Sequence, residues 1–213
     1  MAIIVLVIGK SGTGKSASLR NFEKEEVDII NVESKPLPFR NDFDLINTSD
    51  YKAVAEAIKG SEKKSIVVDD AGYLMTTAFM KGHSAAGSGN AIFSFYNTLA
   101  DFFWKMLTFC KGKGVAPDKI VYFIMHEDKN DFGDIKPKTI GKLLDEKVNI
   151  EGMFTIVLRS VFHDGKYFFR TKTDGFDVSK TPIGMFEQEE IENDLKFVDA
   201  TIREYYGIKE TKK

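Results

Sequence analysis

Residues 9–16 read Gly-Lys-Ser-Gly-Thr-Gly-Lys-Ser and fit the pattern G-x-x-x-x-G-K-[ST] at every defined position. Glycines here allow the backbone to curl so that several N–H groups point inward, which is what a bound phosphate requires. The apolar, β-branched run over 3–8 predicts a buried strand before this loop, and a short helix over 15–22 is expected after it. Such a helix directs its positive N-terminal end at a bound anion. We therefore predict that the loop, called the P-loop below, binds the phosphates of ATP.

The last residues of the motif have separate roles. Lys15 is expected to reach the β- and γ-phosphates, and the Ser16 hydroxyl is expected to ligate Mg²⁺. ATP and Mg²⁺ are therefore the cofactors that the sequence predicts. The predicted nucleotide-binding residues are Gly9, Lys10, Ser11, Gly12, Thr13, Gly14, Lys15, Ser16 and Ala17.

Composition narrows the class of protein. The chain has 213 residues, a net charge of −2 and a single cysteine, Cys110. One cysteine excludes an internal disulfide and is typical of a reducing cytoplasm, where we expect the protein to reside. No stretch approaches the ~20 apolar residues that a membrane span needs, so no membrane contact is expected. Because the net charge is close to zero, any contact with nucleic acid must come from a local basic patch.

Strands and helices alternate along the chain, which predicts an α/β fold with a mostly parallel sheet and flanking helices. Asp164-Gly165 separates two apolar runs and predicts a C-terminal antiparallel hairpin. Without a repeat or a long linker, residues 1–213 are expected to form a single domain. The other expected strands are 27–32, 65–68, 119–125, 154–162 and 166–172, and the other expected helices are one between Asp50 and Gly60, 91–110 and 187–206.

Two of these helices bear on the core. Segment 91–110 is apolar on more than one face, so we expect it to be mostly buried, with its aromatic side chains in the core rather than around a ligand. A regular apolar stripe over 187–206 predicts an amphipathic final helix.

Two adjacent carboxylates end the predicted strand at 65–68. Asp69 is at the position of a Walker B residue, which binds Mg²⁺ together with the Ser16 hydroxyl. Asp70 either polarises the attacking water or is simply solvated, and the spacing leaves both interpretations open.

Glu33 ends the predicted strand at 27–32, and His126 ends the one at 119–125. The carboxyl ends of parallel strands meet at one crevice, so both side chains are expected near the P-loop. From spacing alone, Glu33 is either a water-activating carboxylate or a loop acid. His126 is either a sensor of the γ-phosphate or a residue satisfied by ordinary hydrogen bonds.

These segments, in this order, resemble RecA-like core P-loop ATPases, in particular the small bacteriophage ATP-binding proteins of single-strand annealing and recombination. The resemblance covers most of the chain. After the P-loop it rests on Asn31-Val32-Glu33, Val67-Val68-Asp69-Asp70, Phe123-Ile124-Met125-His126, Phe168-Phe169-Arg170-Thr171-Lys172 and the C-terminal stretch from Gly184 to Leu195.

The resemblance implies roles for several residues. Glu33 would be the catalytic glutamate, and His126 would occupy the sensor position where these proteins typically carry Gln. Arg170 and Lys172 would complete the site of a neighbouring subunit in a homo-oligomer, although a basic edge strand that blocks aggregation is the alternative. It further implies an ATPase that acts on single-stranded DNA with phage recombination or replication proteins in the host cytoplasm.

The segment after His126 would face the DNA. Lys136, Lys138 and Lys142 form its basic patch, and Phe132 is the aromatic residue that could stack on a base. The alternative for the lysines is a solvated loop. Two other functions stay open: a small-molecule P-loop kinase, although the chain lacks an arginine cluster for a lid, and a nucleotide-gated interaction protein with little turnover.

Overall fold

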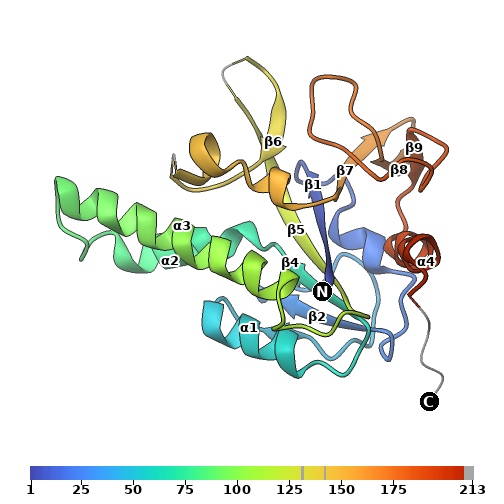
Figure 1. Cartoon of the computed structure of the whole chain (residues 1–213), viewed down its shortest axis with the longest axis horizontal. Coiled ribbons are helices and arrows are strands. Elements are labelled where there is room, and N and C mark those ends of the chain that lie inside the picture. Colours follow the sequence, from blue (N-terminus) through green and yellow to red (C-terminus); the bar gives the residue numbers. More distant parts are fainter. Residues whose placement is uncertain (131, 142, 209–213) are drawn as a thin grey trace.

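The fold is built on a twisted sheet that runs through the whole molecule (Figure 1). The computed structural model describes residues 1–130, 132–141 and 143–208. In these ranges, nine strands join in the order β3-β2-β4-β5-β1-β7-β8-β9, with β6 paired to β5. Their bounds are β1 Ile3–Gly9, β2 Val27–Asn31, β3 Ile46–Asn47, β4 Ser65–Asp69, β5 Ile120–Lys129, β6 Ile135–Pro137, β7 Ile156–His163, β8 Lys166–Arg170 and β9 Glu190–Glu192.

Strands β3 to β7 along this order are parallel, whereas the pairs β5–β6, β7–β8 and β8–β9 are antiparallel. The predicted α/β fold, with a mostly parallel sheet and a C-terminal antiparallel hairpin, is therefore confirmed. The hairpin turns at Asp164 (φ 52°) and Gly165 (φ 72°), as the Asp-Gly pair predicts. The strand β1 is almost wholly buried, because β5 and β7 flank it within the sheet and its alternate side chains pack into the apolar clusters on the two faces.

Helices cover both faces of the sheet (Figure 1). Helices α1 (Tyr51–Gly60), α2 (Gly72–Gly82) and α3 (Asn90–Lys111) pack on one face, and α4 (Leu195–Tyr206) packs on the other. The chain also forms short turns of 3-10 helix over Ser16–Leu19 and Ile150–Met153, and of π-helix over Leu143–Val148. No helix in the described ranges is both long and apolar enough to cross a lipid bilayer.

Several elements differ from the expected ones. After the P-loop the chain forms only the 3-10 turn Ser16–Leu19. The helix expected over 187–206 begins only at Leu195, where the Asp194 side chain accepts hydrogen bonds from two backbone N–H groups. Ile191 belongs to β9 instead, because β8 offers a free edge to that segment. The helix α2 was not expected.

Burial of α3 is less complete than its composition predicts. Phe103 and Met106 are buried, but Phe102 is 47% exposed and Trp104 is 44% exposed. Phe93, nearer the N-terminal end, is 67% exposed. This end of α3 extends beyond the sheet and runs beside α2 (Figure 1), so fewer neighbours cover it. The expectation that the helix is mostly buried is therefore wrong for its outer face.

Candidate nucleotide-binding site at the sheet edge

The P-loop leaves β1 at the carboxyl edge of the sheet, between β5 and β7. Gly9 pairs in register with His126 on one side and with Ser160 on the other. Gly14 has a φ of 94°, and a Cβ atom there would lie 2.8 Å from the Tyr167 ring. The loop therefore needs glycine at this position for its backbone conformation and for the close approach of that ring. Ser160 holds the loop by donating a hydrogen bond of 2.6 Å from Oγ to the Thr13 carbonyl.

Lys15 lies inside the cradle that the loop forms. Its side chain is only 6% exposed, and Nζ donates a hydrogen bond of 2.8 Å to the Lys10 carbonyl. Burial lowers the pKa of Lys15, and the negative charges of Asp70 and Asp69 oppose that change. A buried ammonium group held by a carbonyl of the same loop suits an anionic ligand, because a phosphate oxygen is a stronger acceptor than a carbonyl.

Ser16 and Asp69 connect the P-loop to β4. Ser16 Oγ donates a hydrogen bond of 2.9 Å to Asp69 Oδ1, across 53 residues of sequence. Asp69 is 1% exposed, and burial, helped by the charge of Asp70, raises its pKa to about 6. A hydroxyl and a single carboxylate fit Mg²⁺, which is usually held by one or two carboxylates together with substrate phosphates and water. Within the described ranges, no three His, Cys, Asp or Glu side chains form a metal cluster.

Asp70 lies beside Asp69, and its side chain is 3% exposed. The Asp70 carboxylate forms an ion pair with the ammonium group of Lys35, a residue that was not expected at the site. His126 Nε2 lies 3.5 Å from Asp70 Oδ1. Burial and the nearby positive charge of Lys15 lower the pKa of His126, so its imidazole is neutral at pH 7. The backbone of Asp70 has a φ of 58°, an uncommon conformation for a residue other than glycine.

Glu33 is placed differently from the other acids. The strand β2 ends at Asn31, and Glu33 follows in an exposed turn. Among the described residues it has no hydrogen-bond or ion-pair partner. The structure therefore brings Lys15, Ser16, Asp69, Asp70 and His126 together, whereas Glu33 points to no partner in this cluster.

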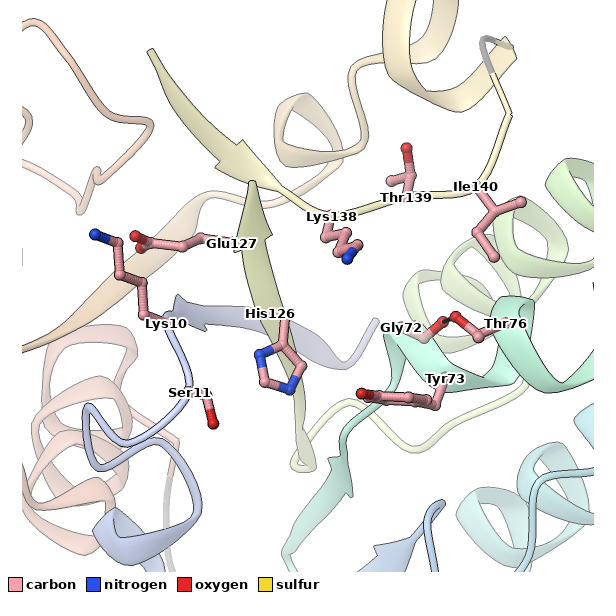
Figure 2. A pocket seen from close by; sticks show the side chains of 10 residues that line it. All are labelled: Lys10, Ser11, Gly72, Tyr73, Thr76, His126, Glu127, Lys138, Thr139 and Ile140. Carbon is pink, nitrogen blue, oxygen red and sulfur yellow. Dashed lines mark hydrogen bonds between the residues drawn. The ribbon is translucent and has the colours of Figure 1, made fainter. Parts of the chain in front are cut away.

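A cavity of about 410 Å³ opens beside the P-loop (Figure 2). Its walls come from the P-loop, the start of α2, the end of β5 and the segment after β6; the lining residues are Lys10, Ser11, Gly72, Tyr73, Thr76, His126, Glu127, Lys138, Thr139 and Ile140. Lys138, expected to bind DNA, lines this cavity, and its backbone N–H donates to the His126 carbonyl at 2.8 Å. Lys136 lies opposite Asp128 in the β5–β6 ladder. Lys142 lies outside the described residues.

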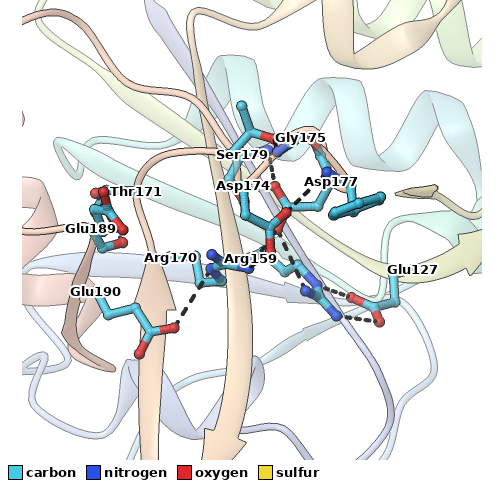
Figure 3. A network of polar contacts seen from close by, with 12 residues as sticks. Glu127, Arg159, Arg170, Thr171, Asp174, Gly175, Asp177, Ser179, Glu189 and Glu190 are labelled. Carbon is cyan, nitrogen blue, oxygen red and sulfur yellow. Dashed lines mark hydrogen bonds and ion pairs between the residues drawn. The ribbon is translucent and has the colours of Figure 1, made fainter.

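Arg170 (Figure 3) and Lys172 are both held by contacts within the chain. Arg170 Nη1 lies 2.6 Å from an Asp174 carboxylate oxygen and 3.5 Å from one of Asp177. Lys172 lies beyond the end of β8, and its Nζ donates to the Glu187 carbonyl at 3.1 Å. Both cations are thus engaged in this single chain.

A second arginine extends this network to the nucleotide site. Arg159 contacts both oxygens of buried Glu127, with nitrogen–oxygen distances of 2.8 and 3.2 Å, and lies 3.5 Å from Asp177 (Figure 3). Because Glu127 also lines the cavity beside the P-loop, a series of ion pairs connects that cavity to Arg170.

Sequence reasoning missed Lys35 and the residues that brace the P-loop. Lys35 follows Glu33-Ser34 in the loop after β2, and no periodicity assigns a side-chain direction to such a position. Asn193 donates from Nδ2 to Ser160 Oγ at 3.1 Å, although 33 residues separate them. No sequence signal could have identified this contact, since it depends on β9 pairing with β8.

Comparison with known proteins agrees with the motif. A family model described as an AAA domain matches residues 1–182. No curated protein matches the chain. The matched region contains all the predicted site residues, whereas α4 lies beyond it.

Proposed function

Because the chain belongs to the AAA domain family, whose members are P-loop ATPases, we propose that it hydrolyses ATP with Mg²⁺ and acts on single-stranded DNA in phage recombination or replication. The observation that carries the ATPase proposal is the hydrogen bond from Ser16 to Asp69. It brings the hydroxyl of the P-loop and the carboxylate of β4 together beside Lys15, as Mg-dependent phosphoryl transfer requires.

Different residues of the site would bind the phosphates, hold the metal ion and accept the proton. The P-loop N–H groups and Lys15 bind the phosphates and hold them in place. Ser16 and Asp69 would hold Mg²⁺, which neutralises charge on the β- and γ-phosphates when bound. Asp70 is the better-placed proton acceptor for the attacking water, because it is buried in the cluster while Glu33 is exposed. His126, neutral and 3.5 Å from Asp70, senses the state of the site.

The DNA proposal rests on the hairpin formed by β5 and β6. It begins at the site, since His126 belongs to β5, and it ends in a turn where Phe132 is 91% exposed. A second loop carries Phe176, which is 67% exposed, and the Ile135 N–H donates to the Phe176 carbonyl at 2.8 Å. Two exposed aromatic rings on adjoining loops, together with Lys136 in β6 and Lys138 just after it, suit the stacked bases of a single strand.

The decisive experiment measures ATP binding and ATP turnover with and without a single-stranded oligonucleotide. The wild type should bind ATP and hydrolyse it, and the oligonucleotide should stimulate turnover. Lys15→Ala should lose at least about 100-fold in turnover, because it removes a charge that stabilises the transition state. Lys24→Ala, an exposed lysine outside the site, is the matched control and should behave as the wild type.

Two further variants identify the proton acceptor. Asp70→Asn should lower turnover by about 100-fold or more, while Glu33→Gln should retain it. The reverse order would assign the role to Glu33. ATP binding without turnover would instead make the protein a nucleotide-gated interaction protein, and turnover that ignores the oligonucleotide would remove single-stranded DNA from the proposal.

A further inference from the structure

Lys35 is a cation at the centre of the site that the mechanism above does not use. It comes from the loop after β2, yet its ammonium group pairs with Asp70, the proposed proton acceptor. The Lys35 side chain is 53% exposed, whereas the Asp70 side chain is 3% exposed. One partner of this ion pair is therefore fixed in the protein interior, and the other reaches it from the solvent side.

The backbone that carries Lys35 is held in place. Asn31, whose Cα is the register partner of Asp69, donates from Nδ2 to the Lys35 carbonyl at 2.8 Å. Ser34 just before it has a φ of 53°, and Pro36 just after it restricts the backbone further. Anchored main chain and an exposed side chain together mean that the ammonium group can change partner while the loop stays in position.

The charges around Lys35 indicate which new partner it would take. The charges of Asp69 and Asp70 raise the pKa of Lys35, and the charge of Lys35 in turn lowers the pKa values of Lys15 and Asp69. The four groups therefore lie in one small region. Burial lowers the pKa of Lys35, but the hydrogen bond and charge of Asp70 outweigh this and raise it, so the group stays protonated. A terminal phosphate bound at Lys15 would bring a more highly charged acceptor into the same region.

We propose that Lys35 moves from Asp70 to the terminal phosphate of a bound nucleoside triphosphate, and that this move frees Asp70 to accept a proton. The proposal rests on the ATPase function proposed above. In the hydrolysis step, the water oxygen bonds to the γ-phosphorus as the bond from that phosphorus to the β–γ bridging oxygen breaks. One water proton passes to the Asp70 carboxylate, the products are ADP and inorganic phosphate, and Lys35 remains protonated. Asp70 is thus held inactive until a triphosphate is present.

The first test compares the dissociation constants of ADP and of the non-hydrolysable triphosphate adenylyl-imidodiphosphate. Lys35→Ala should weaken triphosphate binding by about 10- to 100-fold, because a charge-assisted contact with the terminal phosphate is lost. ADP binding should change by no more than about twofold, since ADP lacks that phosphate. Lys52→Ala, an exposed lysine on α1, is the control and should alter neither constant. Lys35→Gln provides a second variant that removes the charge but keeps a polar, slightly shorter side chain, and it should weaken triphosphate binding in the same way.

The second test is a double-mutant cycle with Asp70→Asn. Removing the Asp70 charge should tighten triphosphate binding in the wild-type background, because Lys35 is then free to reach the phosphate. The gain should shrink when Lys35 is already alanine, leaving only the loss of direct repulsion. An equal gain in both backgrounds would overturn the proposal.

The outcomes separate this inference from the ATPase proposal. A wild type that binds neither nucleotide overturns both. A wild type that binds and hydrolyses ATP, combined with a Lys35→Ala variant whose ratio of triphosphate to ADP affinity is unchanged, overturns only the role of Lys35. If that variant loses turnover with the ratio unchanged, Lys35 merely positions Asp70 and the contact with phosphate is refuted.

Discussion

Burial and a neighbouring carboxylate act on Asp69 in the same direction. They raise its pKa to about 6, although the hydrogen bond from Ser16 opposes them, whereas an unfolded Asp has a pKa of 3.8. A folded-state pKa above the unfolded one means that the protonated form stabilises the fold. This contribution is complete below pH 3.8 and is lost as the pH rises through about 6. At pH 8 the metal-free protein therefore carries the full cost of an ionised, buried Asp69.

Asp69→Asn should remove this cost. In metal-free and nucleotide-free buffer at pH 8, we expect the free energy of unfolding to rise by about 1–3 kcal/mol, because a pKa difference of two units is worth about that much. The gain should vanish towards pH 4. Urea unfolding with a chelator present measures it, and Asp42→Asn, an exposed site, should show no comparable gain. With Mg²⁺ and ATP added, the wild type should become the more stabilised protein. A less stable Asn variant at pH 8 without metal would contradict this account.

The β5–β6 hairpin runs from the buried core to the solvent-exposed surface. Its first strand is buried from Ile120 to Met125, becomes half-buried at His126, and is exposed at Asp128 and Lys129. The turn beyond holds Phe132, which no other described side chain covers appreciably, since it is 91% exposed. The strand β5 therefore leaves the core beside the P-loop and leads to a turn with an exposed aromatic ring. This arrangement could couple nucleotide binding to a ligand bound at the turn.

Phe132→Ala tests the hairpin directly. If the ring stacks on a base, the variant should lose about 1–3 kcal/mol of single-stranded DNA binding while ATP affinity is retained. Phe197→Ala is the matched control, because Phe197 is 50% exposed on α4, away from the hairpin. Each of Lys136 and Lys138 that binds a phosphate should contribute about −0.7 to the slope of log K against log salt, so alanine at both should flatten it. Equal affinities and slopes in all variants would remove the hairpin from the DNA site.

Arg170 and Lys172 are expected to act between subunits, in an assembly of several chains. Within one chain, Arg170 contacts Asp174, Asp177 and Glu190, so a role at a neighbouring site requires the neighbour's phosphate to compete with these carboxylates. Mixing inactive subunits tests this. A Lys15→Ala subunit keeps Arg170 but cannot bind phosphate, whereas an Arg170→Ala subunit keeps its P-loop but lacks the arginine. In a ring of equal amounts of both, mixed at random, about a quarter of the head-to-tail interfaces would join an intact P-loop to an intact Arg170, and these should recover activity.

The controls for this mixture are the two variants alone and the thermal unfolding of Arg170→Ala, since the change leaves Asp177 with Arg159 as its arginine partner. An Arg170→Ala protein that is monomeric and fully active would show that the arginine has no role between subunits. The contacts in Figure 3 would then be purely structural.

Features that depend on residues close together in the chain could be predicted from the sequence. The α/β class, the buried strands and the turn at Asp164-Gly165 follow from periodicity and turn chemistry over a few residues. So does the start of α1, where the Asp50 side chain accepts a hydrogen bond from the Ala53 N–H. The P-loop pattern is equally local, and its match to an AAA domain agrees with it. Where a competing long-range contact existed, local reasoning was wrong: residues 190–192 pair with β8 instead of starting the last helix.

The composition of the site was decided only by the tertiary structure. The strand order places β5 between β1 and β4, which brings His126, Ser16 and Asp69 to one point from three distant segments. It also leaves Glu33 exposed and brings Lys35 to Asp70, and it surrounds Arg170 with carboxylates. Periodicity gives the face on which a residue lies but not which strands become neighbours or where a loop side chain points. Strand order and the direction of loop side chains depend on how the whole chain packs, and they decide which partners each charged group finds.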